Sequence, residues 1–112
     1  MRIIDLGGQS LHSIENTPAW SEVFLAHAWI DGIVGTGAHG PLTGALAESV
    51  ELLNRLSAIR PRPVIAIDVP SGLTDDDGAI VGPILHATHT LAVGTYKRAQ
   101  VLPPAVEFTG DI

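Results

Sequence analysis

Apolar residues gather in short runs rich in β-branched side chains, and these runs predict β-strands. They cover residues 2–6, 29–34, 63–69 and 88–93, and a fifth run at 105–108 is a weaker candidate. Within each run the apolar positions are continuous rather than alternating with polar ones, which is typical of parallel strands covered by helices on both faces. The pattern therefore predicts an α/β fold with a mainly parallel sheet and right-handed crossovers.

A different spacing, of three and four residues, predicts a long amphipathic helix over residues 43–59. Its apolar face comprises Leu46, Val50, Leu53 and Leu56. Thr43 is a candidate N-cap, and Pro61 and Pro63 end the helix because proline cannot donate the next backbone hydrogen bond. A second, weaker helix is predicted over residues 17–26.

Composition narrows the class of protein. The chain has 112 residues, which suits one small domain, and its net charge of −6 with no basic cluster disfavours nucleic-acid binding. It has no cysteine, no apolar run that approaches a membrane span and no leader-like N-terminus, so we expect a cytoplasmic protein that does not bind membranes. The spacings of zinc sites, phosphate loops and serine-hydrolase elbows are also missing from the sequence.

A glycine-rich loop follows the second apolar run and precedes the long helix. It has the pattern GxGxxG, and its residues are Gly35, Thr36, Gly37, Ala38, His39, Gly40 and Pro41. Such a loop between a strand and a helix can present backbone N–H groups to a phosphate. A tight turn that needs positive φ angles would carry the same glycines, so the pattern alone leaves both interpretations open.

Polar residues lie where two of the predicted parallel strands end, and loops at these ends can share one crevice. A buried Asp31 inside the strand 29–34 would need a bound cation, a hydrogen bond from a neighbouring loop, or an outward-facing position. Asp68 ends the strand 63–69, where it could exchange protons or bind a ribose hydroxyl, and Ser71 follows in the motif DVPSG. The long segment that comes next, up to residue 87, is typical of a functional loop.

Lys97 follows the strand 88–93 in the motif GTYK and is predicted to project from the same edge of the sheet. A cation there could bind a phosphate, although a solvated surface lysine would fit the position equally well.

Taken in order, the motifs DGIVGTGAHGPLTG, VIAIDVPSGLTDDDGAIVGP and HATHTLAVGTYK resemble the second half of the YjeF N-terminal domain family, the NAD(P)H-hydrate epimerases. The resemblance covers roughly residues 29–112. It implies a Rossmann-like three-layer α/β/α sandwich that interconverts the R and S forms of hydrated NADH and NADPH, which carry a hydroxyl at nicotinamide C6.

The resemblance also implies roles for individual residues. Residues 35–41, Asp68 and Lys97 would bind the substrate, Asp68 would be catalytic, and Asp31 and Ser71 would coordinate a potassium ion. Oxygen ligands of this kind suit a hard cation.

One motif of the family, a GNNGGDG-type loop after its first strand, has no counterpart in residues 1–28. We therefore expect residues 1–112 to form a single, N-terminally truncated domain that needs a homodimer partner or a complementing chain for activity. Two alternatives stay open: a non-catalytic binding or scaffold module of the same family, and a small NAD-binding Rossmann half.

Overall fold

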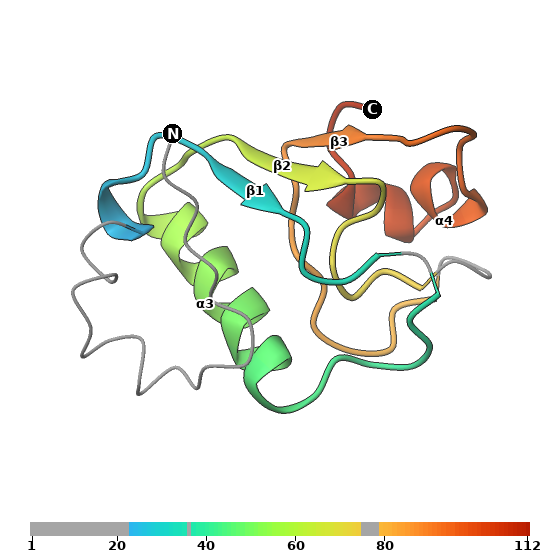
Figure 1. Cartoon of the computed structure of the whole chain (residues 1–112), viewed down its shortest axis with the longest axis horizontal. Helices are drawn as coiled ribbons and strands as arrows, with labels where there is room; N and C mark the ends of the chain where they lie inside the picture. Colours follow the sequence, from blue (N-terminus) through green and yellow to red (C-terminus); the bar gives the residue numbers. More distant parts are fainter. Residues whose placement is uncertain (1–22, 36, 75–78) are drawn as a thin grey trace.

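The fold is built on a small parallel sheet, seen in a computed structural model that describes residues 23–35, 37–74 and 79–112 (Figure 1). Its strands, in the order β1-β2-β3, are β1 (Trp29–Asp31), β2 (Val64–Ile67) and β3 (His89–Leu91). Both strand pairs are parallel, with Trp29 beside Val64 and Ile65 beside His89. The predicted α/β fold with a parallel sheet is confirmed, and the predicted strand 2–6 lies outside the described residues.

The long helix α3 (Gly44–Ile59) connects β1 to β2 and confirms the prediction from apolar spacing. Thr43 is its N-cap, but the Thr43 side chain makes no capping hydrogen bond. Its buried face packs with strand residues in the main core, whose members are Val23, Trp29, Val50, Leu52, Leu53, Leu56, Val64 and Leu85. Residues 23–25 are helical, and the rest of the helix predicted before Ala26 lies outside the described residues.

Two short helical segments follow β3: α4 (Arg98–Val101) and the 3-10 helix η1 (Ala105–Phe108). The prediction of a fifth strand at 105–108 is therefore wrong. Pro104 already has a helical backbone conformation, and the Glu107 N–H donates to the Pro104 carbonyl at 3.1 Å, as a 3-10 turn requires. A four-residue apolar run carries too little periodicity to separate the two structures. The segment that does extend the sheet lies further on, where Asp111 forms an isolated parallel bridge with His89.

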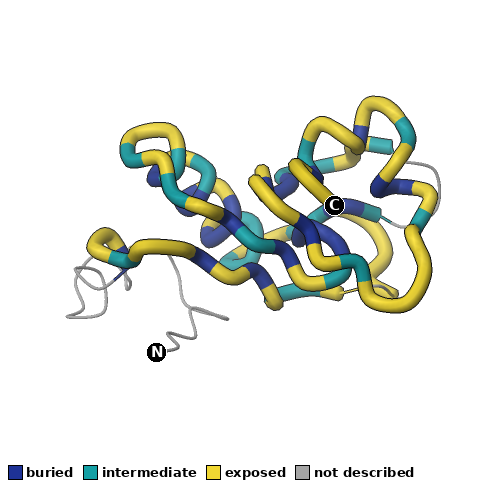
Figure 2. Tube along the Cα trace, turned by 90° about the horizontal axis from the view of Figure 1, so that it is seen from above, coloured by how far each residue is buried: buried dark blue, intermediate teal, exposed yellow. Residues whose placement is uncertain are grey.

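Figure 2 shows buried and exposed residues close together along the chain, and within β1 and β3 they alternate, so the two faces of the sheet differ in burial. One face carries the buried residues Trp29, Asp31, Val64, Ala66 and Thr90. In Figure 1, α3 lies below β1 and β2, and α4 lies below the chain that continues from β3; the Thr90 hydroxyl, on the buried face, donates to the Thr109 carbonyl at 2.7 Å. On the opposite face of the described sheet, Ile30 is 63% exposed and Leu91 is 58% exposed.

That exposure differs from the sequence expectation of helices on both faces. A continuous apolar run shows that both faces avoid polar side chains, but it does not identify what covers each of them. In the part of the chain that the structure describes, no helix is long and apolar enough to cross a membrane.

Candidate functional site at the carboxyl edge of the sheet

Asp31, the last residue of β1, is buried and bound to the turn that follows β2. Asp31 is 2% exposed, and its carboxylate accepts hydrogen bonds from the Ser71 N–H at 2.7 Å and the Ser71 hydroxyl at 2.5 Å. It also accepts from the Ile33 N–H at 3.2 Å. The sequence left three possibilities for a carboxylate at this position: a bound cation, a hydrogen bond from a neighbouring loop, or an outward-facing side chain. The structure shows hydrogen bonds from a neighbouring loop.

Ser71 completes a second link between the same two loops. The Ser71 hydroxyl oxygen accepts a hydrogen bond from the Val34 N–H at 3.1 Å, while the hydroxyl group donates its own hydrogen bond to Asp31. The Ser71 carbonyl in turn accepts from the Leu85 N–H at 2.9 Å. This fully buried serine therefore holds the start of the glycine loop, the turn after β2 and the segment before β3 together.

The chemistry of the Asp31 and Ser71 oxygens is compatible with a hard monovalent cation. A carboxylate has about four acceptor positions, and the three hydrogen bonds that described residues donate to Asp31 leave one position on Oδ2. The described residues contain no cluster of three His, Cys, Asp or Glu side chains, so hydroxyl and main-chain oxygens would have to supply further ligands. Potassium coordination by these two residues stays a prediction.

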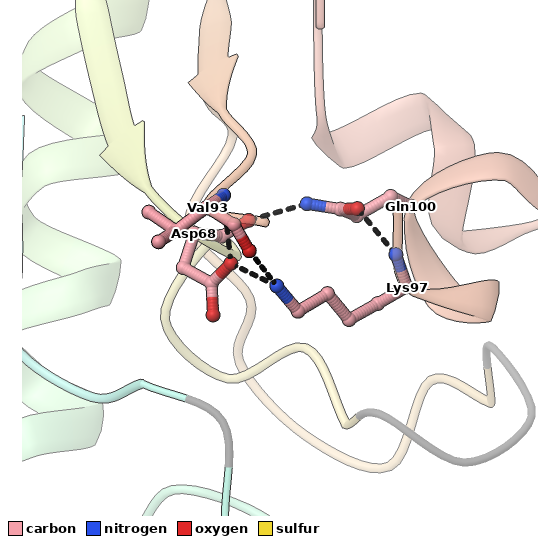
Figure 3. A network of polar contacts seen from close by, with 4 residues as sticks. All are labelled: Asp68, Val93, Lys97 and Gln100. Carbon is pink, nitrogen blue, oxygen red and sulfur yellow. Dashed lines mark hydrogen bonds and ion pairs between the residues drawn. The ribbon is translucent and has the colours of Figure 1, made fainter. Parts of the chain in front are cut away.

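Asp68 and Lys97 form the second pair at this edge, drawn in Figure 3. The Lys97 ammonium donates to Asp68 Oδ1, and the Val93 N–H donates to the same oxygen at 3.1 Å. Both side chains are 17% exposed, so the ion pair is partly screened from water yet open to it. The Lys97 ammonium also donates to the Val93 carbonyl at 2.8 Å, so Lys97 is not the solvated surface lysine that the sequence left possible.

The backbone at Asp68 has a conformation that L-residues rarely adopt. Its φ of +70° lies in the left-handed region, and Asp68 is the only residue other than glycine in the described part of the chain with a positive φ. The Asp68 N–H donates to the Leu91 carbonyl of β3 at 2.8 Å. The chain thus turns away immediately after β2 while its carboxylate stays beside the end of β3.

Gln100 is a member of this cluster that sequence reasoning missed. It is fully buried in α4, its side-chain NH₂ donates to the Asp68 carbonyl, and its side-chain oxygen accepts from the Lys97 N–H at 2.6 Å. The available signal was the spacing from the N-cap residue Lys97 to the third helical residue, which is the spacing of a capping box.

The described part of the glycine loop is exposed and sterically open. Gly37 and Gly40 have φ angles of +106° and +80°, so the turn interpretation of these glycines is correct at both positions. A Cβ atom added at either glycine would meet nothing within 4 Å, which leaves space for a bound molecule. Pro41 packs against Gly82, whereas Thr36 lies outside the described residues. Ligand binding by residues 35–41 stays a prediction.

The arrangement thus brings together two pairs of predicted site residues, Asp31 with Ser71 and Asp68 with Lys97. Both pairs lie at the carboxyl ends of parallel strands, where open α/β sheets bind their ligands. A partly exposed carboxylate beside an ammonium group can exchange a proton with a bound hydroxyl group and can attract an anion.

A parallel sheet with helices and a polar cluster at its carboxyl edge places the chain in the Rossmann-like α/β class. The sequence model of the family described as "YjeF-related protein N-terminus" matches residues 3–99. The chain therefore belongs to this family, and the match begins earlier along the chain than the motifs from residue 29 onwards indicate.

Relatives with functional names agree with this family. The chain is 36% identical over 98 residues to the bifunctional NAD(P)H-hydrate repair enzyme Nnr of Thermosynechococcus vestitus, covering 88% of this chain and 18% of that protein. It is 41% identical over 83 residues to the NAD(P)H-hydrate epimerase of Rhodopirellula baltica, covering 74% of this chain and 32% of that protein. The chain thus spans less than a third of the length of each of these curated relatives.

Proposed function

We propose that this chain, as one domain over residues 1–112, forms an NAD(P)H-hydrate epimerase site. The observation that carries the proposal is the Asp68–Lys97 ion pair at the carboxyl edge of the sheet. The hydrogen-bonded pair of Asp31 and Ser71 lies at the same edge. The family match and the names of the relatives support the same activity. The substrates are the hydrated forms of NADH and NADPH, with the open glycine loop at residues 35–41 on their phosphates.

In this proposal Asp68 is the catalytic residue and touches the hydroxyl at nicotinamide C6. The Asp68 carboxylate takes up a proton from solvent and passes it to that hydroxyl, the C6–O bond breaks with its electron pair on oxygen, and water leaves. The lone pair of the ring nitrogen N1 forms a double bond to C6, which makes the ring planar there. Water then adds to the opposite face of C6 and releases a proton to solvent, so one proton enters and one leaves, and the net result is inversion at C6.

Lys97 controls the charge at this position. Its ammonium lies against the Asp68 carboxylate and stabilises the charged form that Asp68 has before it takes up a proton and after it has passed that proton on. The Val93 N–H, which donates to the same oxygen, keeps that carboxylate at the end of β3.

Asp31 and Ser71 are the proposed ligands of a potassium ion in the same site. The support is their donor chemistry: one buried carboxylate and one buried hydroxyl, with an acceptor position left on Asp31 Oδ2. A bound cation would supply positive charge next to Asp31 and would strengthen the connection between the ends of β1 and β2.

We place the protein in the cytoplasm and expect it to act as a homodimer or with a complementing chain. The support for a partner is the exposed apolar face of the described sheet, on which Ile30 and Leu91 lie. Light scattering of the purified chain measures its molar mass and therefore shows whether it forms a homodimer.

The activity is tested with epimerically pure S or R hydrates of NADH and NADPH in potassium buffer. We expect the 112-residue chain to speed the approach to an R/S mixture well above the rate without protein, as followed by chromatography. Asp68→Ala should remove this acceleration, whereas the control Asp111→Ala should keep it because the Asp111 side chain is 94% exposed. An epimer ratio that changes no faster with the chain than without it would refute the proposed activity.

A further inference from the structure

The Gln100 side chain connects the two halves of the Asp68–Lys97 pair through their backbones (Figure 3). Its NH₂ group donates to the carbonyl of Asp68, and its oxygen accepts the backbone N–H of Lys97 at 2.6 Å. One amide therefore links the residue after β2 to the N-cap residue of α4. Resting on the proposed function, we infer that Gln100 is a positioning residue that sets the geometry of the catalytic Asp68 and of Lys97.

The chemistry of an amide is needed at this place. The Asp68 carbonyl can only accept a hydrogen bond and the Lys97 N–H can only donate one, so the bridging group must offer a donor and an acceptor together. Gln100 is fully buried and both of its side-chain bonds are part-buried, so water would have to displace the Gln100 side chain to replace them. A carboxylate would keep the acceptor and lose the donor, and an apolar side chain would lose both.

The strained backbone at Asp68 explains why such a link matters. A left-handed φ at a residue with a Cβ persists where the surroundings hold it, and the Asp68 N–H and C=O are both bound, to Leu91 and to Gln100. Without the Gln100 bond, the peptide that follows Asp68 loses a partner that fixes its orientation. The carboxylate would then move relative to Lys97, whose own backbone would also lose its bond.

The chain offers a matched control in Asn54 of α3. Its side-chain NH₂ donates to the Ile84 carbonyl at 2.8 Å, and its oxygen accepts the His86 N–H at 2.9 Å. It therefore bridges two backbone groups with one amide in the same way, but on elements outside the Asp68–Lys97 cluster. Gln100→Met and Asn54→Leu remove the same number of hydrogen bonds and keep most of the side-chain volume.

The first measurement is amide hydrogen exchange at Lys97 in the 112-residue chain, which does not depend on activity. In Gln100→Met, exchange of the Lys97 N–H should accelerate about tenfold or more relative to the amides of α3, because the part-buried hydrogen bond to Gln100 is lost. In Asn54→Leu the same ratio should stay at its wild-type value. An unchanged ratio in Gln100→Met would overturn the inference.

The second measurement is epimerisation, corrected for the folded fraction by circular dichroism. Gln100→Met should lower kcat about tenfold or more with a small change in KM, because misplacement of a catalytic group acts on the chemical step. Asn54→Leu should leave both constants near wild type. Equal losses of kcat in the two variants would show a merely structural role and overturn the inference.

Gln100→Glu serves as a second variant and decides the question if Gln100→Met does not fold. It retains an oxygen for the Lys97 N–H, so protection of that amide should persist, while kcat should fall because the donor to Asp68 is gone. A wild-type kcat in Gln100→Glu would overturn the inference. If the wild-type chain shows no epimerisation, the proposed function fails, and the exchange ratio alone decides whether Gln100 holds the pair.

Discussion

Removal of the Asp31 carboxylate should destabilise the fold strongly, and the structure gives the reason. Asp31→Ala takes away the acceptor of two buried bonds from Ser71 and of one bond from the Ile33 N–H. Ser71 is fully buried, so its N–H cannot turn to bulk water, and its hydroxyl would have to find another acceptor. The substitution thus creates unsatisfied donors between β1 and the turn after β2.

The expected loss follows from the number and type of these bonds. A hydrogen bond to a charged group contributes about 1.5–3 kcal/mol, and a buried donor left without a partner costs about 1–3 kcal/mol. Relief from burying the Asp31 charge offsets part of this sum, because desolvation of a carboxylate costs several kcal/mol. The net expectation is a decrease of about 3 kcal/mol in the free energy of unfolding, a large share of the roughly 5–15 kcal/mol of a typical domain.

Urea unfolding followed by circular dichroism measures this change in the 112-residue chain. Ser71→Ala should cost less, about 1–2 kcal/mol, because the Ser71 N–H still reaches Asp31. The double variant should show a coupling energy of about 1–3 kcal/mol between the two positions. Asp111→Ala is the exposed control and should stay within about 0.5 kcal/mol of wild type. A loss below about 1 kcal/mol in Asp31→Ala would refute the assignment of Asp31 as the clasp between the two loops.

Three further predictions concern the turn glycines, the proposed cation and the core. Gly72→Ala should destabilise the fold more than Gly94→Ala, by about 1–3 kcal/mol in urea unfolding. Both glycines have a positive φ, but only a Cβ atom at Gly72 would meet the Pro83 carbonyl oxygen, at 2.1 Å. Equal losses in the two variants would contradict this steric argument. Potassium chloride should raise the melting temperature of the wild-type chain above its value in sodium chloride at equal ionic strength, and this difference should vanish in Asp31→Ala; no difference in wild type would argue against the cation. Val50→Ala should cost about 1–3 kcal/mol, since Val50 is fully buried in the main core, and a neutral result would show that α3 does not pack there.

The sequence predicts the elements of this fold better than their ends. Apolar spacing predicts α3 to within one residue, because a long amphipathic period and a following proline define a helix well. The strand predicted over 29–34 ends at Asp31, where the carboxylate binds the Ile33 N–H and draws the backbone away from the sheet. The strand predicted over 63–69 ends at Ile67, before the left-handed Asp68. Both ends depend on side-chain to backbone bonds that no hydrophobic pattern records.

The candidate site shows the same division between residue identity and pairing. Parallel strands bring their carboxyl ends to one edge, so the sequence could predict that Asp31, Asp68 and Lys97 share it. The family resemblance predicts Asp31 and Ser71 as ligands of one ion, but the spacing of two residues 40 positions apart does not predict the direct hydrogen bond between them, because that contact depends on how two loops close.

Gln100 is the clearest case of a residue whose role needs the fold. In the sequence it is a polar residue that follows the GTYK motif and belongs to no predicted element, and the default expectation for such a residue is exposure to solvent. In the structure it is fully buried. Its side-chain NH₂ group donates to the Asp68 carbonyl, and its side-chain oxygen accepts from the Lys97 N–H. A buried amide is stable only where its donor and acceptor are both satisfied. Here the two backbone groups that satisfy the amide belong to Asp68 and Lys97, the two partners of one ion pair. The hydrogen bonds that allow Gln100 to be buried are therefore also those that fix the geometry of the site.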